Sequence, residues 1–246
     1  LLFNAMIHPL TRFPIKGVIW YQGENNVNRA YQYRKTFPLM ISDWRNHWKQ
    51  GDFPFYFVQL ASWKAANGNS NSGSSWAELR EAQFLTLSLP NTGMAVTIDI
   101  GDTNDIHPRN KQDVGKRLAA IALNKAYNKQ NTFSGPILDT VTFERNKAKL
   151  NFIHASSGLM IKDKYGYIRG FEIAGADKKF YYAKAAIEGN TIVISHDSVA
   201  KSVAVRYAWA DDAGDANLYN KEGFPMTPFR TDTWDGISKN VKYNIR

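Results

Sequence analysis

Residues 98–108 carry the side chains whose types and spacing could do chemistry. This segment, Ile-Asp-Ile-Gly-Asp-Thr-Asn-Asp-Ile-His-Pro, places three carboxylates and one imidazole within eleven residues. His107 can act as a general base near neutral pH, and a carboxylate beside it can hold the ring in one tautomer and stabilise its cation. Asp105 and Asp102 are the candidates for that carboxylate. The alternative is that these Asp side chains only cap turns and the next helix.

The segments on either side suit a catalytic loop. An apolar run over residues 93–98 leads into it, and a helical pattern over residues 111–127 follows it. The pattern predicts a strand, a polar loop and a helix in that order. Because ligands of α/β folds bind at the carboxyl ends of strands, the loop lies where chemistry is expected.

A second polar block follows another predicted strand. The apolar run over residues 16–21 is typical of a buried parallel strand, and Gln22-Gly23-Glu24-Asn25 come directly after it. The side-chain amide of Gln22 can donate to a developing oxyanion, and Gly23 lets backbone N–H groups approach a substrate. Alternatively, Gln22 and Glu24 simply bridge neighbouring loops.

Up to about residue 130, predicted strands and helices alternate. A strand over residues 54–60 lies between the two strands already described. The alternation implies a parallel sheet covered by helices on both faces, and we assign residues 1–136 to this α/β domain. A doubly wound sheet usually has about five strands, so we expect further strands before Leu1 and a chain that is part of a longer protein.

Three features distinguish the predicted helices. The first helix, over residues 1–10, is expected to pack through Leu2, Met6 and Leu10. The second has an apolar face that we interpret as core, and Pro38 should kink or interrupt it. Residues 75–78 have the form of a capping box that opens a third helix running toward Ser88. The core face of the second helix comprises Tyr33, Phe37, Met40, Ile41, Trp44 and Trp48.

Beyond Pro136 the helical periodicity ends and short apolar runs follow one another closely. They predict a β-rich accessory domain over residues 137–246, mostly antiparallel, with a returning tail of polar and aromatic loop over 217–235. The expected strands cover residues 140–143, 149–152, 170–173, 180–187, 191–195 and 202–208.

Composition excludes several classes of protein. The chain has 246 residues, 43% of them hydrophobic, and no long apolar span, which is typical of a globular protein rather than a membrane helix. The net charge of +9 comes from scattered Lys and Arg, so we interpret it as a solvated surface that tolerates acidic glycans, and we expect no nucleic-acid or membrane partner. The absence of Cys excludes disulfides and thiol catalysis.

Other polar residues offer weaker sites. No two His residues stand at metal-ligand spacing, so we expect no histidine metal site, and we predict no cofactor. Asp99, Asp102 and Asp105 could hold Ca²⁺ or Mg²⁺ through oxygen atoms, although Asp99 lies in the strand, so the prediction is no metal. Ser70 lies in a Gly/Ser/Asn loop over residues 67–75, whereas a nucleophile needs a rigid elbow after a strand. We therefore reject Ser70 as the nucleophile.

Two blocks taken together resemble the sialate O-acetylesterase family, a branch of the SGNH-type carbohydrate esterases. They are Gly-Val-Ile-Trp-Tyr-Gln-Gly-Glu-Asn-Asn at 17–26 and Asp-Ile-Gly-Asp-Thr-Asn-Asp-Ile-His-Pro-Arg-Asn-Lys at 99–111. The resemblance implies a flavodoxin-like three-layer α/β/α hydrolase, incomplete at the N-terminus, with a β-rich addition. It implies removal of O-acetyl groups from sialic acids or related glycans, with His107 as the catalytic histidine and Gln22 as the oxyanion donor.

The sequence departs from the family pattern in two ways. The nucleophile block Gly-x-Ser-Asn of the family should precede Leu1, so this chain alone should be inactive. Many SGNH enzymes have Asp three residues before the histidine, but that position is Asn104 here, which leaves Asp105, Asp102 or a backbone carbonyl to orient His107. A non-catalytic glycan-binding or structural fragment is therefore the alternative function. We expect the intact protein to be secreted or periplasmic and to act on an O-acetylated carbohydrate.

Overall fold

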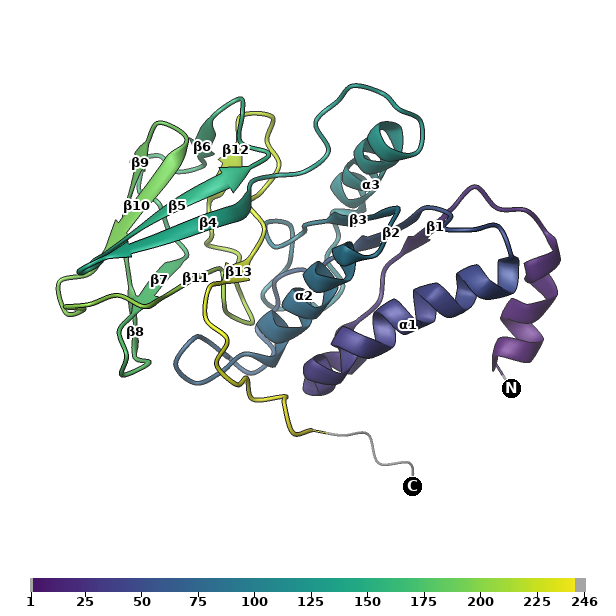
Figure 1. The fold of residues 1–246 in the computed structure, drawn as a ribbon, viewed down its shortest axis with the longest axis horizontal. Coiled ribbons are helices and arrows are strands. Elements are labelled where there is room, and N and C mark those ends of the chain that lie inside the picture. The colour runs from purple at the N-terminus through teal and green to yellow at the C-terminus, as the bar shows by residue number, and fades with distance from the viewer. Residues whose placement is uncertain (1, 242–246) are drawn as a thin grey trace.

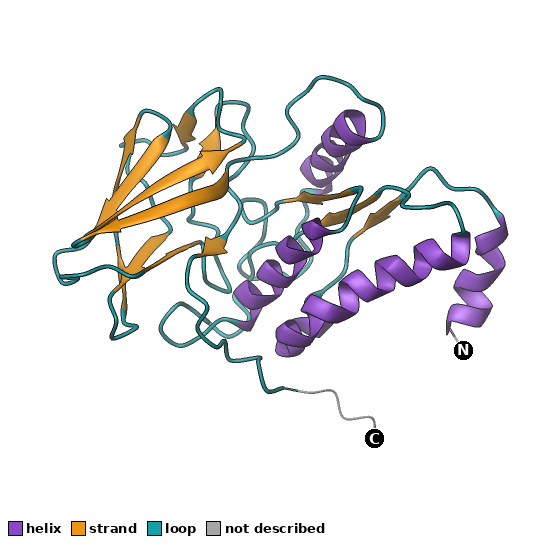
Figure 2. Cartoon of the chain, viewed as in Figure 1, coloured by secondary structure: helices purple, strands orange, loops and turns teal. Residues whose placement is uncertain are grey.

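The computed structural model describes residues 2–241, with helices gathered at one end and most strands at the other (Figures 1 and 2). The helices are α1 (Ala30–Trp48), α2 (Ser75–Leu85) and α3 (Lys111–Lys125), with single turns of other helix types at Phe3–Ile7, His8–Arg12, Glu24–Arg29 and Thr86–Ser88. The strands of the helical part are β1 (Val18–Trp20), β2 (Phe55–Val58) and β3 (Thr92–Ala95).

These three strands pair in parallel in the order β1-β2-β3. Helices α1 and α2 lie side by side on one face of the sheet, whereas α3 packs on β2 and β3 from the other face (Figure 1). Strand β2 is buried throughout, but β1 is an edge strand and Ile19 is 71% exposed. The expectation that the first strand is buried on both faces was therefore wrong, because α3 covers β2 and β3 and leaves Ile19 open to solvent.

Helix α1 runs through Pro38 without interruption. Proline removes one backbone hydrogen bond and crowds the preceding turn, which normally disfavours a helix interior. Here the burial of Phe37 and Ile41 on either side of Pro38 holds the helix against the sheet. Of the predicted core face, Tyr33 and Trp48 are also buried, while Met40 and Trp44 are half-buried against the same core.

The first predicted helix was wrong in its packing. The segment forms a π-helical turn at Phe3–Ile7 and a 3₁₀ turn at His8–Arg12 rather than an α-helix. Leu2, Met6 and Leu10 are 76%, 63% and 50% exposed, and Ile7 is the side chain that packs against the core. The change of helix type before Pro9 rotates the apolar residues away from one common face.

Helix α2 begins one residue earlier than its sequence predicts. The hydroxyl of Ser74, not Ser75, accepts a hydrogen bond from the backbone N–H of Ala77 and caps the helix. The carboxylate of Glu78, which a capping box would turn back to the cap, instead accepts from the backbone N–H groups of Ile237 and Ser238. Tertiary contacts with the tail thus replace the local capping partner.

After α3, the regular elements of the described chain are all strands, joined by loops. Two four-stranded antiparallel sheets have the orders β4-β5-β10-β9 and β13-β11-β7-β8, and β12 pairs with β6. The expected strand over 180–187 is divided at Ala183, and β6, β12 and β13 were not predicted because they are only two or three residues long. The bounds are β4 Ile137–Glu144, β5 Lys147–Ile153, β6 Leu159–Ile161, β7 Phe171–Ala174, β8 Phe180–Tyr182, β9 Lys184–Glu188, β10 Thr191–Ser195, β11 Ala204–Tyr207, β12 Leu218–Asn220 and β13 Phe229–Arg230.

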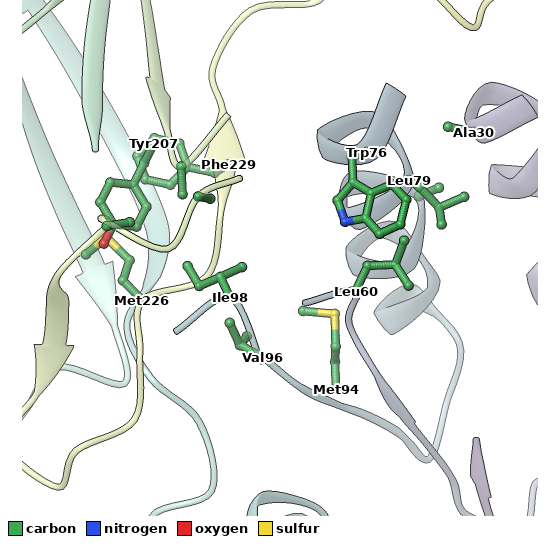
Figure 3. Packing of buried hydrophobic residues seen from close by; sticks show 14 of the residues in the cluster. Ala30, Leu60, Trp76, Leu79, Met94, Val96, Ile98, Tyr207, Met226 and Phe229 are labelled. Carbon is green, nitrogen blue, oxygen red and sulfur yellow. The ribbon is translucent and has the colours of Figure 1, made fainter. Parts of the chain in front are cut away.

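One hydrophobic core continues from the parallel sheet into the β-rich part (Figure 3). Leu60 and Ile98, which follow β2 and β3, belong to the same cluster as Tyr207, Met226 and Phe229. The division of the chain at residue 136 remains a prediction, since the packing is continuous across it.

Arg80 connects the two parts through hydrogen bonds inside this core. Its guanidinium is fully buried and donates to four backbone carbonyls, those of Leu60 and Ala61 after β2 and those of Ala210 and Asp211 from the β-rich part. Burial lowers the pKa of Arg80, and the nearby charge of Asp211 opposes that effect. The carbonyls of Leu60 and Ala210 have no other donor among the described residues, and an unpaired buried polar group is costly.

Replacing Arg80 with Met, which keeps most of the volume, should lower the free energy of unfolding by about 3 kcal/mol or more, because the carbonyls of Leu60 and Ala210 lose their donor and two further hydrogen bonds are lost. Urea unfolding followed by circular dichroism measures this loss. Arg12→Met, at an exposed position, is the matched control. A difference between the two variants of under about 1 kcal/mol would contradict the role given to Arg80.

Candidate functional site

Gln22 and His107 line one cavity of about 540 Å³, although 85 residues separate them in the chain. One side comes from the loop after β1 and the other from the loop that precedes α3. Parallel strands bring their carboxyl ends to the same edge of a sheet, which is why these two loops meet. The other lining residues are Tyr21, Glu24, Asn25, Ile106, Pro108 and Lys111.

The side-chain amide of Gln22 is held from both ends. Its carbonyl oxygen accepts from the hydroxyl of Tyr33 at 2.9 Å, and its nitrogen donates to Oδ1 of Asn26 at 2.7 Å. Burial raises the pKa of Tyr33 far above its ordinary value, so this hydroxyl stays protonated and remains a donor. The two contacts set which end of the amide is the donor, and one of its two N–H groups stays outside them. The sequence assigned Tyr33 only to the core and missed this second function.

Gly23 shapes the backbone beneath the cavity. It is buried and has φ of +154°, and a Cβ built on it would lie 2.9 Å from Cδ2 of Leu79 and 3.2 Å from Nε2 of Gln83. That Gln83 amide donates to the backbone oxygen of Gln22. Gly23 itself does not line the cavity, and its contact with substrate stays a prediction. Glu24 and Asn25 do line it.

Lys111 and Tyr21 meet at the wall of the cavity. The Lys111 ammonium lies 4.9 Å from the centre of the Tyr21 ring, a distance at which a cation is attracted to an aromatic face. Burial, with a smaller contribution from Glu24, raises the pKa of Tyr21 to about 12. The phenol is therefore neutral at physiological pH and lines the site as a hydrogen-bonding group.

The two carboxylates proposed to orient His107 differ in their contacts. Asp105 Oδ1 lies 3.5 Å from Nδ1 of His107 and also accepts from the His107 backbone N–H at 2.8 Å. Asp102 accepts from the backbone N–H of Asn104, as a turn-capping side chain does. The His107 side chain is 86% exposed, so the ring stands open to the cavity and to solvent. Geometry therefore favours Asp105, while Asp102 has the capping function offered as the alternative.

Asp99 is held away from this site. Arg117 from α3 binds both of its carboxylate oxygens, at 2.6 and 2.7 Å, and the Tyr219 hydroxyl donates to one of them. This bidentate pair neutralises the carboxylate. Across residues 2–241, no three His, Cys, Asp or Glu side chains come together in a way that could hold a metal ion.

Ser70 lies elsewhere and is committed to another partner. It is buried, its hydroxyl donates to Glu172, and it does not line the cavity of His107. Its loop is also more fixed than its composition suggests. Asn71 exchanges side-chain hydrogen bonds with the backbone of Phe180, and Asp211 accepts from the N–H of Gly68. The rejection of Ser70 stands on its position rather than on the flexibility of its loop.

Comparison with known proteins places this geometry in a family. The sequence profile described as carbohydrate esterase, sialic acid-specific acetylesterase matches residues 2–124. Sialate O-acetylesterases of Pongo abelii and Homo sapiens are each 33% identical over 98% of the chain and 51% of their own length. The chain belongs to the sialic acid-specific acetylesterase family. The resemblance read from residues 17–26 and 99–111 is thus confirmed.

A solved structure agrees with this membership in the esterase family. The crystal structure of a carbohydrate acetylesterase from Xanthomonas citri is 48% identical, with a TM-score of 0.91 over 95% of this chain and 54% of its own. The chain therefore spans about half the length of the acetylesterases it matches. No helix within residues 2–241 is both long enough and apolar enough to cross a membrane.

Gly23→Ala should lower the free energy of unfolding by about 1–3 kcal/mol, because the new methyl group meets Leu79 and the backbone must leave its positive φ. Thermal unfolding of the purified chain measures it. Gly115→Ala is the matched control: Gly115 lies within α3 with open space around it, so Ala there should stabilise the chain by about 0.4–1 kcal/mol. Equal effects of the two substitutions would contradict the steric account of Gly23.

Proposed function

We propose that this chain forms part of a carbohydrate esterase that removes O-acetyl groups from sialic acids or related glycans. The observation that carries the proposal is the shared cavity of Gln22 and His107, in a chain of this family. A donor amide and a basic imidazole facing one space are the groups that acyl transfer needs besides a nucleophile. The proposed partner is an O-acetylated carbohydrate, and the proposed location is secreted or periplasmic.

In the proposed reaction a serine oxygen attacks the acetyl carbonyl. Nε2 of His107 accepts the serine proton and later returns it to the sugar oxygen as the alcohol leaves, and water then hydrolyses the acyl-enzyme. The N–H of Gln22 that is not used by Asn26 donates to the oxyanion. Because Tyr33 and Asn26 hold this amide, the donor needs little reorganisation as charge develops.

The proposed serine lies upstream of this chain. None of the described residues that line the cavity is Ser, Thr or Cys, and the one serine weighed as nucleophile, Ser70, is bound to Glu172. The chain matches only about half of its relatives' length, which leaves room for a nucleophile elsewhere in the protein. The same observation supports the second candidate function, a non-catalytic glycan-binding or structural fragment.

The proposed fold is the three-layer α/β/α arrangement of SGNH hydrolases. Its support is the parallel sheet with α1 and α2 on one face and α3 on the other. Three strands are fewer than the roughly five of a doubly wound sheet, and β1 carries an open edge and an exposed Ile19. These features suit an incomplete sheet, with a β-rich accessory region after residue 136.

His107→Ala in the full-length protein should lower the turnover of an O-acetylated sugar by several orders of magnitude, since it removes the proposed general base. Gln22→Ala should lower it by about 10²–10³-fold through loss of one oxyanion donor. Acetate release measures both. His47→Ala, on the exposed side of α1, is the control. Turnover by residues 1–246 alone would overturn the upstream serine and return Ser70 to consideration, and full activity of His107→Ala would remove residues 98–108 from the mechanism.

Asp105→Asn should lower turnover more than Asp102→Asn does, by about tenfold or more, because only Asp105 lies within reach of the His107 ring. Exposure of the pair to solvent limits the effect below that of a buried triad. Steady-state kinetics of the two variants measure the ratio. Equal loss in both, or greater loss in Asp102→Asn, would move the orienting function away from Asp105.

A further inference from the structure

A second cavity, of about 470 Å³, lies on the other side of the loop that carries His107. Asp99, Gly101 and Thr103 of that loop line this second cavity, whereas Ile106, His107 and Pro108 line the first. Its opposite wall comes from β7, β8 and the loop over residues 208–215. The space is thus shared between the α/β part and the β-rich part, a place where ligand sites often form.

The charge of this cavity is opposite to that of the protein. Its lining contains four carboxylates, those of Asp99, Glu172, Asp212 and Asp215, and none of the described residues lining it is Lys, Arg or His. The whole chain carries +9. Arg117 neutralises Asp99, but the other three have no cation within ion-pair distance among residues 2–241. A negative charge brought into this space would be repelled.

Glu172 is a buried acceptor that faces the cavity. Its residue surface is only 8% exposed, and one carboxylate oxygen accepts from the Ser70 hydroxyl. No hydrogen bond from a described residue reaches the other oxygen. Burial raises the pKa of this carboxyl, while the hydrogen bond from Ser70 and the charge of Arg206, its neighbour on β11, oppose the rise. Because Glu172 lines the cavity, this second oxygen can accept a hydrogen bond from a ligand or water there.

An aromatic ring stands beside this carboxylate. Tyr182 is the cross-strand neighbour of Glu172 in the β7–β8 pair, so both side chains lie on the same face of the sheet. Its ring is 78% exposed and lines the cavity, while Trp209 lines it from the buried side. The wall therefore offers hydrogen-bond acceptors and an aromatic surface. A sugar ring has matching groups, because its hydroxyls donate hydrogen bonds and its C–H face packs on aromatic rings.

We infer that this cavity binds an uncharged, hydroxyl-rich sugar unit of the glycan and excludes anionic ones. A metal ion does not fit, because no three acidic or imidazole groups within residues 2–241 converge. Sugar hydroxyls donate to Glu172, Asp212 and Asp215, and the exposed ring of Tyr182 packs on the sugar face. This inference rests on the proposed glycan substrate and deepens it: the group bound beside the His107 loop is neutral, not a sialate.

The two cavities are close enough to serve one oligosaccharide. The chain between Thr103 and His107 spans at most about 14 Å when fully extended, so a glycan of a few units can occupy both. The hydrogen bond from the Thr103 hydroxyl to Asp212, at 2.7 Å, joins the wall of the second cavity to the His107 loop. A sugar bound there would hold its neighbour toward His107 and Gln22.

The test is sugar binding to the chain, followed by methyl NMR of Ala208 and Ala213, which both line the second cavity. The probes are lactose, cellotetraose, xylotetraose, galactosamine and 3′-sialyllactose. At least one neutral sugar should shift both methyl signals, and 3′-sialyllactose should shift them only at higher concentration. The double variant Asp212→Asn with Asp215→Asn should weaken the neutral sugar by about tenfold and strengthen 3′-sialyllactose. Asp197→Asn, at an exposed carboxylate paired with Lys184, removes one negative charge outside the cavity, where the double variant removes two inside it, and is the control.

Three outcomes would overturn the inference. They are no binding of any neutral sugar at millimolar concentration, a preference for galactosamine or sialyllactose in the unaltered chain, and the same effect from Asp197→Asn as from the double variant. Failure of the proposed function is a different result, because it is read from acetate release. An active esterase whose Ala208 and Ala213 signals ignore neutral sugars would keep the function and refute only the second cavity.

Discussion

The buried guanidinium of Arg80 is the contact on which the rest of the structure depends. It donates hydrogen bonds to the carbonyls that follow β2 on one side and to those of residues 210 and 211 on the other. A cation is tolerated there because each guanidinium nitrogen donates to at least one carbonyl oxygen, and the carbonyls of Leu60 and Ala210 have no other donor among the described residues. The end of the parallel sheet and the β-rich part are thereby held together, and Ala210, one of these carbonyl residues, lines the second cavity.

The same packing leaves some charged side chains paired and others without an ion-pair partner among the described residues. Buried ion pairs such as Arg117 with Asp99 and Arg206 with Asp232 are bidentate, and their charges cancel. Of the four carboxylates that line the second cavity, Glu172, Asp212 and Asp215 have no such ion-pair partner among the described residues. A chain of net charge +9 therefore carries a negative interior space next to its His107 loop. The cavity around His107 differs in that both Lys111 and Glu24 line it.

Local sequence patterns failed wherever a distant segment supplied a competing partner. Glu78 has the spacing of a capping residue, yet it accepts from the backbone N–H groups of Ile237 and Ser238, and the helix is capped by Ser74. Ile19 belongs to the apolar run that predicted a buried strand, yet its position in the edge strand leaves it exposed. Tyr33 was correctly assigned to the core, but its hydroxyl also holds Gln22, which no helical pattern reveals.

The sequence by itself determined the parallel strands, the helices between them, the strand-rich second half and the family. Those properties follow from local periodicity and from two contiguous blocks, since period and motif are written along the chain. The meeting of Gln22 with His107 also followed, because parallel strands align their carboxyl ends. Only the tertiary structure showed that Asp105 lies 3.5 Å from the His107 ring, paired Ser70 with Glu172, and brought Glu172, Asp212 and Asp215 to one cavity. The physical reason is that these outcomes depend on distances and burial between segments far apart in the chain, and one-dimensional spacing contains neither.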